Sequence, residues 1–268
     1  MTVADAGTAR RADEAVAKLV AAQQERTEIE PLVDDWPDLD ERTAYDLQHR
    51  VVAKLVADES TRVHGLKLGL TSVAKQQQMS VHEPIYGVLI GSRLHPEGEA
   101  LEIGSLIHPK IEPEIAVTLK HALRGPGVTR DQAKAAVGAA YVAMEVIDSR
   151  YRNFRFGLAD VVADNTSAAR YLVAARPVPV DDLDLRTLGV VFERDGEVVS
   201  TAAGAAVLGD PYLALAWLAN KVAEHGNESL DAGSLILTGA LTDAVSVVSG
   251  SVVRVEIARL GSLSVRCI

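Results

Sequence analysis

Two glutamates separated by one residue form the most informative pair in the sequence. They lie in the segment 108–117, where Glu112 and Glu114 alternate with apolar residues. Successive side chains of a β-strand point to opposite faces, so these two carboxylates would share one face, about 7 Å apart. Two like charges at that distance are costly to desolvate unless a cation lies between them. The pattern therefore predicts a divalent-cation site, and an exposed strand face carrying solvated glutamates is the alternative.

A third carboxylate favours the metal interpretation. Residues 141–148 have the pattern of a further strand, in which Glu145 stands among apolar neighbours. A glutamate in such a run is usually paired, hydrogen-bonded or bound to a metal, because Glu is seldom fully buried alone. Three carboxylate ligands suit Mg²⁺ or Mn²⁺ better than a metal that prefers thiolates, and the sequence has no His or Cys spacing typical of zinc sites. We therefore predict that Glu112, Glu114 and Glu145 bind Mg²⁺ or Mn²⁺.

One lysine interrupts an otherwise apolar segment, 65–72, that is predicted to form a strand. Lys67 lies between Gly65 and Gly69, and glycines in a strand let a ligand or another backbone approach closely. We predict that Lys67 is catalytic and substrate-binding, because it can meet an anionic substrate or move a proton. The alternative is a lysine whose charge reaches solvent from a strand end.

Other polar segments could supply substrate contacts. Residues 149–156 interleave three arginines with aromatic residues, and arginine suits bidentate binding of a carboxylate, although ion pairs between subunits are an alternative. Ser167 ends a polar loop and could donate a hydrogen bond to a ligand, although loops rich in Asp and Asn often form simple turns. We predict substrate contacts from Arg150, Ser167 and Thr238, of which Thr238 ends a buried strand.

Charge and cysteine content exclude several classes of protein. The 268 residues include 27 Lys and Arg against 37 Asp and Glu, a net charge of −10. This acidity disfavours a protein that binds nucleic acid or an anionic membrane surface. The single cysteine, Cys267, excludes a disulfide-stapled secreted domain, and no run of about 18 uncharged apolar residues is present. We therefore expect a cytoplasmic protein that contacts neither nucleic acid nor a membrane.

The hydrophobic spacing predicts the elements that must position these residues. Apolar residues at helical spacing indicate a surface helix over 8–28 and a second helix that begins after its N-cap, Asp40. From about residue 62 the chain changes to short segments with a period of two, which indicates strands. We expect an α+β protein with a helical N-terminal portion over 1–61 and a strand-dominated core over 62–268.

Two local signals place elements within the core more closely. Asp195-Gly196 suits the positive backbone dihedrals of a tight hairpin turn, and Asp210-Pro211 is typical of the start of a helix. The remaining apolar alternation predicts final strands at about 234–238, 252–258 and 262–267.

Ordered motifs through most of the chain resemble one known family. They include GLKLGLTS, EPIYG, HPKIEPEIAV, LRGPG, EVIDSRYRNFRF, VVADNTS, GAAVLGDP and LTGALTDAV. They are similar to the 2-oxo-3-hexenedioate (4-oxalocrotonate) decarboxylases and 2-hydroxypenta-2,4-dienoate hydratases of aromatic meta-cleavage pathways, which are relatives of the fumarylacetoacetate hydrolase catalytic domain. The resemblance implies a mixed β roll of the fumarylacetoacetate hydrolase C-terminal-domain type with flanking helices, and a homo-oligomer.

The resemblance also implies roles for individual residues. In that family the Glu-x-Glu pair and a later glutamate hold Mg²⁺ or Mn²⁺, and a strand lysine lies near the substrate. These roles fall on Glu112, Glu114, Glu145 and Lys67, and Ser167 corresponds to a substrate contact. In the mechanism that the resemblance implies, Arg150 or Arg155 would contact the distal carboxylate of the substrate or have a structural role.

Within the family, HPKIEPEIA, LRGPG and SRYRNFRF resemble the decarboxylase branch. The resemblance therefore implies metal-dependent decarboxylation of a small 2-oxo dicarboxylate, 2-oxo-3-hexenedioate, to 2-hydroxypenta-2,4-dienoate and CO₂. A hydratase acting on that dienoate is the alternative within the same site. A non-catalytic partner subunit is a further alternative, because decarboxylase and hydratase of this family are known to associate in a complex.

Overall fold

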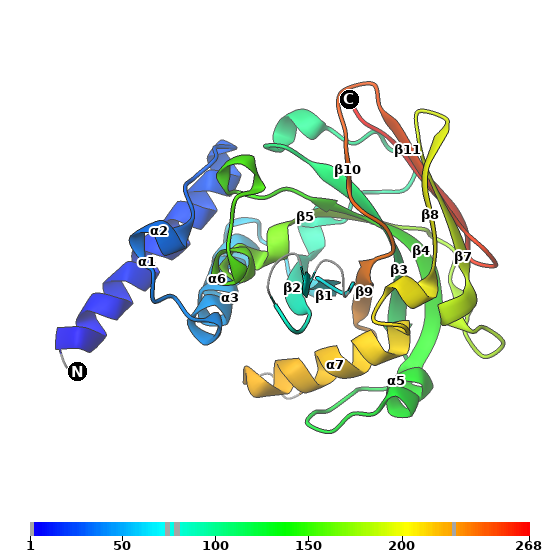
Figure 1. The fold of residues 1–268 in the computed structure, drawn as a ribbon, viewed down its shortest axis with the longest axis horizontal. Helices are drawn as coiled ribbons and strands as arrows, with labels where there is room; N and C mark the ends of the chain where they lie inside the picture. The colour runs from blue at the N-terminus through cyan, green and yellow to red at the C-terminus, as the bar shows by residue number, and fades with distance from the viewer. Residues whose placement is uncertain (1–2, 73–75, 78–80, 227–228) are drawn as a thin grey trace.

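A helical N-terminal portion and a strand-rich core form the protein (Figure 1). The structure is a computed structural model that describes residues 3–72, 76–77, 81–226 and 229–268. Its helices are α1 (Val3–Glu25), α2 (Leu32–Asp35), α3 (Glu41–Asp58), α5 (Arg130–Ala136), α6 (Leu158–Ala163) and α7 (Pro211–Glu224). Within these residues, no helix combines the length and apolar character that crossing a membrane requires.

The long helix α3 joins the helical portion to the core. It begins where predicted, because the side chain of Asp40 accepts a hydrogen bond from Thr43 N at 2.8 Å and so caps the first turn. Its apolar stripe packs against α1 on one side and against α6 and β2 (Ile85–Ile90) on the other. The buried residues of this stripe are Ala44, Leu47, Val51 and Leu55. Helix α1 ends three residues earlier than the predicted boundary at residue 28.

The larger sheet carries the residues with predicted chemistry. Its hydrogen-bonded order is β2-β1-β9-β3-β4-β5, with β10 paired to β3 and β6 paired to β4. Strands β1 and β9 are parallel, whereas β3 is antiparallel to both β4 and β9. The other strands of this sheet are β1 (Val63–Gly69), β3 (Lys110–Leu119), β4 (Val137–Ile147), β5 (Ala168–Val173), β6 (Val178–Pro179), β9 (Leu235–Ala240) and β10 (Val245–Ser246).

A smaller antiparallel sheet lies next to β4. Its order is β12-β11-β7-β8, and both β11 and β12 contact β4. The predicted hairpin joins β7 to β8, with Asp195 at φ 57° and Gly196 at φ 83° in the turn. The strands of this sheet are β7 (Gly189–Arg194), β8 (Glu197–Ala203), β11 (Val252–Ile257) and β12 (Gly261–Arg266).

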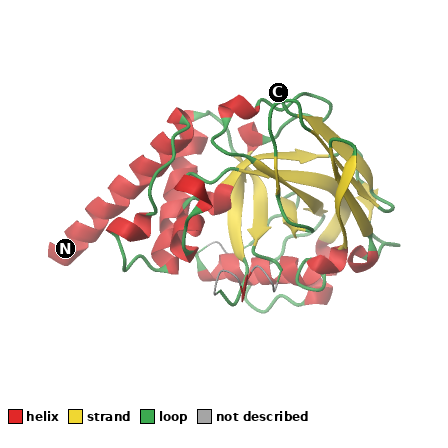
Figure 2. Cartoon of the chain, turned by 45° about the horizontal axis from the view of Figure 1, so that its top comes forward, coloured by secondary structure: helices red, strands yellow, loops and turns green. Residues whose placement is uncertain are grey.

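The two sheets curl around a common interior, and the helices lie outside them (Figure 2). Helix α7 starts at the predicted N-cap, where the Asp210 side chain accepts a hydrogen bond from Tyr212 N at 2.9 Å. One continuous cluster of buried apolar residues includes members of both the helical portion and the sheets. The predicted α+β class and curled mixed sheet are confirmed.

Candidate metal centre

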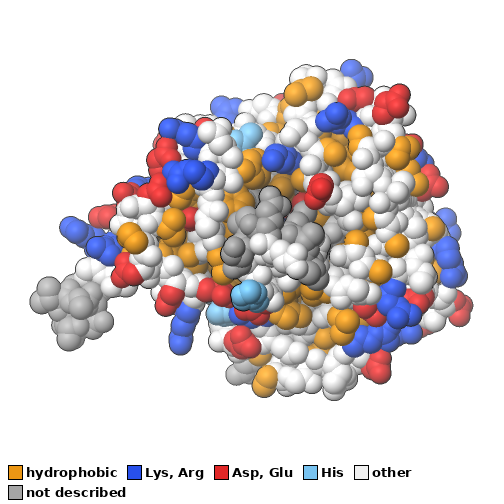
Figure 3. Space-filling view, viewed as in Figure 1, with side chains coloured by type: hydrophobic (Ala, Val, Ile, Leu, Met, Phe, Trp, Pro, Cys, Tyr) orange, Lys and Arg blue, Asp and Glu red, His pale blue; other side chains and the backbone are white. Residues whose placement is uncertain are grey.

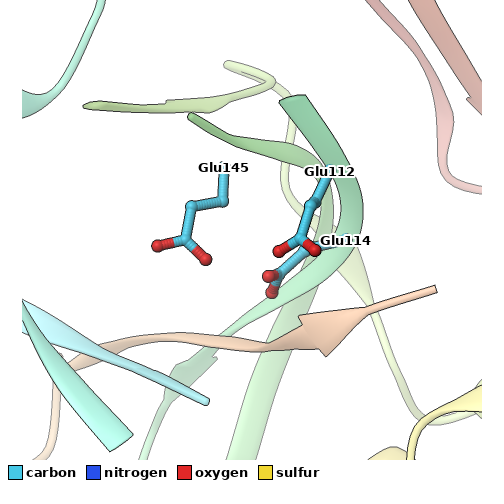
Figure 4. Close-up of side chains that lie close together, drawn as sticks. All are labelled: Glu112, Glu114 and Glu145. Atoms are coloured by element: carbon cyan, nitrogen blue, oxygen red, sulfur yellow. The ribbon is translucent and has the colours of Figure 1, made fainter. Parts of the chain in front are cut away.

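Three glutamates converge on one point in the larger sheet. Glu112 on β3 and Glu145 on β4 are direct cross-strand partners, and Glu114 follows two residues later on the same face of β3. Their carboxylates point toward one another (Figure 4), and one oxygen from each lies within 4.8 Å of the other two. The structure thus brings the three predicted metal ligands together, from two strands that are adjacent in the sheet.

This carboxylate cluster is buried, and burial changes its titration. Glu114 and Glu145 have no exposed surface, and Glu112 is 9% exposed. Burial raises the pKa of Glu145 to about 7, although the nearby Lys67 ammonium opposes the shift. Burial, followed by repulsion from Glu145, also raises the pKa of Glu114 well above its ordinary value. Charged carboxylates are therefore costly at this position until a cation neutralises them.

The cluster fits a divalent cation bound through oxygen. Glu114 Oε2 accepts a hydrogen bond from Gly239 N at 2.8 Å, but Glu114 Oε1 and Glu145 Oε1 are buried and lack hydrogen-bond partners among the described atoms. Three carboxylates gather at one point, and the buried Glu145 carboxylate has the Lys67 ammonium beside it. Carboxylate-only ligands are the donors that Mg²⁺ and Mn²⁺ prefer.

Lys67 is part of the same cluster. Its Nζ lies 2.9 Å from Glu145 Oε2 and donates a hydrogen bond to Thr166 O at 3.1 Å, and the residue is 2% exposed. It does not reach solvent from a strand end, because β1 is held between β2 and β9. The buried ammonium faces the cluster, where it can stabilise negative charge on a bound ligand.

Space for the lysine comes from a glycine on the neighbouring strand. Gly87 on β2 pairs with Lys67, and a Cβ at Gly87 would lie 3.1 Å from Lys67 Cδ and 2.8 Å from Asn165 O. Asn165, Thr166 and Ser167 follow one another with φ of 49°, 54° and 57°. Left-handed backbone is unfavourable for such residues, so the surrounding structure must fix the turn.

Side-chain hydrogen bonds to β2 fix this left-handed turn. The Asn165 amide donates to Val88 O at 2.9 Å and accepts from Val88 N at 2.7 Å, and Thr166 Oγ1 donates to Tyr86 O at 2.8 Å. The turn thereby presents Thr166 O to Lys67 and places Ser167 beside the cluster.

A pocket opens beside the cluster. Glu112, Lys67 and Ser167 contribute polar groups to its lining, and the buried Ser167 Oγ has no hydrogen-bond partner among the described atoms. Ser167 therefore lines the pocket, and its contact with substrate stays a prediction. Apolar side chains form most of the rest of the wall, and on this face of the molecule such side chains are visible between the helical portion and the strand core (Figure 3). The principal apolar residues of the lining are Ile85, Ile147, Phe154, Phe156 and Val161.

Two residues predicted to contact substrate lie outside the pocket lining. Arg150 is 1% exposed, pairs with Asp164, and donates hydrogen bonds to Asp148 O at 2.6 Å and Ala168 O at 3.3 Å. The guanidinium therefore ties the two ends of segment 148–168 together, and it is not among the side chains that line the pocket. Thr238 is fully buried as well. Its hydroxyl donates a hydrogen bond to Ile115 O at 2.9 Å and so links β9 to β3.

The structure adds site groups that sequence reasoning missed. The backbone N–H of Gly239 and the carbonyl of Thr166 contact the cluster, but backbone groups leave no side-chain signature. Gly239 has φ of 113°, and a Cβ there would lie 2.4 Å from Thr71 Oγ1. Both the backbone conformation and the close contact therefore require glycine at this position. The aromatic wall formed by Phe154 and Phe156 was visible in the sequence only as part of the arginine-rich segment.

A family model decides the relationship of this chain to known proteins. Residues 59–267 match the model described as fumarylacetoacetate (FAA) hydrolase C-terminal. The chain belongs to the fumarylacetoacetate hydrolase family. The match covers the strand-rich core and both glutamate strands of the site, and it confirms the family resemblance that the motifs indicated.

Two named groups within the fumarylacetoacetate hydrolase family are similar to this chain. A 4-oxalocrotonate decarboxylase of Pseudomonas putida is 45% identical over 245 residues, covering 91% of this chain and 92% of the relative. A 2-keto-4-pentenoate hydratase of Burkholderia vietnamiensis is 39% identical over 247 residues, covering 92% and 94% of the two chains. A solved 4-oxalocrotonate decarboxylase structure from P. putida, complexed with magnesium and adipate, superposes with a TM-score of 0.92 at 41% identity and full coverage of both chains.

Addition of Mg²⁺ is expected to raise the melting temperature, and more so at pH 8 than at pH 5.5. Because the pKa of Glu145 is raised to about 7 and that of Glu114 is raised too, the metal-free fold binds more protons than the unfolded chain above pH 4.5. These groups therefore stabilise the metal-free fold less as the pH rises through 7, and a cation relieves this loss. Thermal melts with Mg²⁺ or EDTA at both pH values test this, and equal shifts at the two pH values would contradict it.

Proposed function

We propose that this chain is a metal-dependent 4-oxalocrotonate decarboxylase that converts 2-oxo-3-hexenedioate to 2-hydroxypenta-2,4-dienoate and CO₂. The observation that carries the proposal is the buried cluster of Glu112, Glu114 and Glu145, with Lys67 beside it and an apolar pocket next to it. Similarity supports the decarboxylase more strongly than the hydratase, since the decarboxylase relatives are 44–47% identical and the hydratase relatives 37–39%.

The proposed reaction requires a bound divalent metal ion. Glu112, Glu114 and Glu145 would hold Mg²⁺ or Mn²⁺, and a bound ion of this kind supplies a Lewis acid that polarises the 2-oxo group of the substrate. The reaction breaks the bond between C5 and the distal carboxyl group, and CO₂ leaves. The electron pair moves through the C3–C4 alkene toward the 2-oxygen, and protonation of that oxygen gives the dienol product.

The side chains around the pocket would perform the remaining tasks. The Lys67 ammonium is positioned to stabilise negative charge that develops on the 2-oxygen, and the unpartnered Ser167 hydroxyl can donate a hydrogen bond to the substrate. Phe154, Phe156 and Val161 line the same pocket, and in this proposal they would exclude water from the distal half of the substrate. Loss of CO₂ spreads a localised negative charge, so an apolar wall favours the transition state over the ground state.

Lys67→Met is expected to lower kcat by at least about 100-fold, because it removes an ammonium that lies 2.9 Å from Glu145 and is positioned to stabilise the developing charge. Mg²⁺ binding should survive, since the lost charge is positive and the three carboxylates remain. Steady-state kinetics together with calorimetric Mg²⁺ titration check both expectations. Lys120→Met, which alters an exposed lysine, serves as the control. A Lys67→Met protein with wild-type kcat would remove Lys67 from the mechanism.

A pair of parallel assays tests the proposed activity. Purified protein with Mg²⁺ is given 2-oxo-3-hexenedioate, and CO₂ release is recorded; a second sample is given freshly generated 2-hydroxypenta-2,4-dienoate. Release of CO₂ that disappears with EDTA is the expected result. Consumption of the dienoate without CO₂ release from the diacid would identify a hydratase. Metal binding with turnover of neither substrate would favour a non-catalytic subunit, although the complete carboxylate cluster argues against that alternative.

The cellular setting and assembly are part of the same proposal. We expect a cytoplasmic homo-oligomer, with a small 2-oxo dicarboxylate as substrate and a complex with the pathway hydratase. Light scattering of the purified protein, alone and mixed with that hydratase, measures both states. A monomer that does not bind the hydratase would contradict this part of the proposal alone.

A further inference from the structure

A dicarboxylate substrate needs a cation for the carboxylate that lies away from the metal. The arginines of segment 149–156 cannot supply one, because each already has a carboxylate partner. Arg150 is buried against Asp164, Arg152 Nη1 lies 2.8 Å from Glu30, and Arg155 Nη2 lies 2.8 Å from the other oxygen of Glu30. Positive charge for the distal carboxylate must therefore come from another element.

One lysine on β3 meets this need. Lys110 precedes Glu112 by two residues, so its side chain starts on the same face of the strand as the metal-binding carboxylates. Lys110 is not itself a lining residue of the pocket, but two of its neighbours are. These are its cross-strand partner Ile147 on β4 and Phe154, whose ring centroid lies 4.1 Å from Lys110 Nζ. Within the described residues, Lys110 forms no ion pair.

The aromatic ring beside this lysine is held in a strained segment. Asn153 and Phe154 have φ of 55° and 54°, and a bulky residue rarely adopts left-handed backbone unless the surroundings impose it. The ring of His108 packs against Phe154 at a centroid distance of 4.5 Å. Strain of this kind is typical of segments that position a functional group, and here it sets the Phe154 ring next to both Lys110 and the pocket.

We propose that Lys110 binds the distal carboxylate of the substrate and thereby selects dicarboxylates over monocarboxylates; this inference rests on the proposed function. Residues two apart on a strand are about 7 Å apart, a span comparable to that of an extended six-carbon diacid whose other end lies at the glutamates. The ammonium is partly shielded by Phe154, which strengthens its attraction for a carboxylate. The product lacks the distal carboxylate, so it loses this contact and is bound more weakly than the substrate.

Two 2-oxo acids that differ only at the distal end test the proposal. Calorimetry on the Mg²⁺-loaded protein compares 2-oxoadipate with 2-oxohexanoate, which present the same 2-oxo acid group. The wild type is expected to bind 2-oxoadipate at least about tenfold more tightly. Lys110→Met should remove this preference by weakening 2-oxoadipate binding alone, and Lys110→Arg should retain most of it. Lys120→Met, at an exposed lysine that follows the end of β3, should leave the preference unchanged.

The outcomes separate this inference from the proposed function. If the wild type binds neither 2-oxo acid, the proposed function fails. If the wild type prefers 2-oxoadipate and Lys110→Met keeps that preference, Lys110 is not the distal contact and only this inference fails. If Lys110→Met weakens the binding of both acids equally, the lysine supports the structure of the pocket and does not bind the distal carboxylate, and this inference fails. A raised KM for 2-oxo-3-hexenedioate with nearly unchanged kcat in Lys110→Met would provide independent support.

Discussion

Glu114→Gln is expected to abolish Mg²⁺ binding and to lower turnover of 2-oxo-3-hexenedioate by more than about 100-fold. Removing a group that only supports a metal ligand typically lowers metal affinity or activity about 10- to 100-fold. Glu114 belongs to the carboxylate cluster itself, so its loss should have a larger effect. The fold should survive, because the glutamine amide oxygen can still accept the hydrogen bond that Gly239 N donates to Glu114. The variant therefore separates loss of the metal site from loss of structure.

The same substitution is expected to stabilise the metal-free protein at neutral pH. Burial makes the Glu114 carboxylate costly, and Glu145 repels it, so a neutral side chain relieves both effects. Thermal melts in EDTA should thus show Glu114→Gln at or above the wild type, whereas melts in Mg²⁺ should show it below. Glu102→Gln, at an exposed glutamate, is the matched control and should behave as the wild type in both. Wild-type Mg²⁺ affinity in Glu114→Gln would overturn the assignment of this ligand.

Arg150→Met is expected to destabilise the fold by about 3–5 kcal/mol at pH 8, because it leaves the buried Asp164 carboxylate without its cation. Burial already raises the pKa of Asp164 to about 6 against the opposing effect of Arg150. Without the arginine, Asp164 will be protonated in the fold over a wider range of pH. The loss of stability should therefore be smaller at pH 5 than at pH 8, which denaturant unfolding at the two pH values measures.

Two further variants make this stability prediction specific. Adding Asp164→Asn to Arg150→Met should recover part of the lost stability, since no unpaired charge then stays buried. Arg155→Met is the control from the same segment, and it should change stability little, because its partners Glu30 and Asp34 are exposed and solvent screens the pairs. Equal losses from Arg150→Met and Arg155→Met would show that burial of the Asp164 pair contributes nothing.

Local signals in the sequence predicted local structure well. The period-two pattern placed Glu112 and Glu114 on one face of a strand, and the Asp195-Gly196 turn and the Asp40 cap depend only on neighbouring residues. Each of these features is determined by backbone and side-chain geometry within a few residues, so an isolated stretch of sequence is enough to predict it.

Contacts between distant segments could not be predicted from residue patterns. Whether Arg150 faces a ligand or Asp164 depends on how segment 148–168 folds back, and the arginine-rich pattern fits both arrangements equally. The contact of Lys67 with Glu145 requires β1 to enter the sheet beside β9, which is encoded almost 170 residues later. The left-handed turn at 165–167 was predicted only as a polar loop, because its residues have no glycine to signal positive φ.

The parallel pairing of β1 with β9 also affects how the chain acquires its site during synthesis. Lys67, Glu114, Glu145 and Gly239 meet only when β9 has been inserted between β1 and β3. An N-terminal fragment that ends before residue 235 contains all three glutamates but lacks the strand that joins their sheet to the lysine strand. Closure of so long a loop is entropically costly and slow, so the complete site is a late product of folding. The contact of Lys67 with Glu145 therefore forms only when the last strand of the larger sheet is in place, whereas the three glutamates already lie on the directly paired strands β3 and β4.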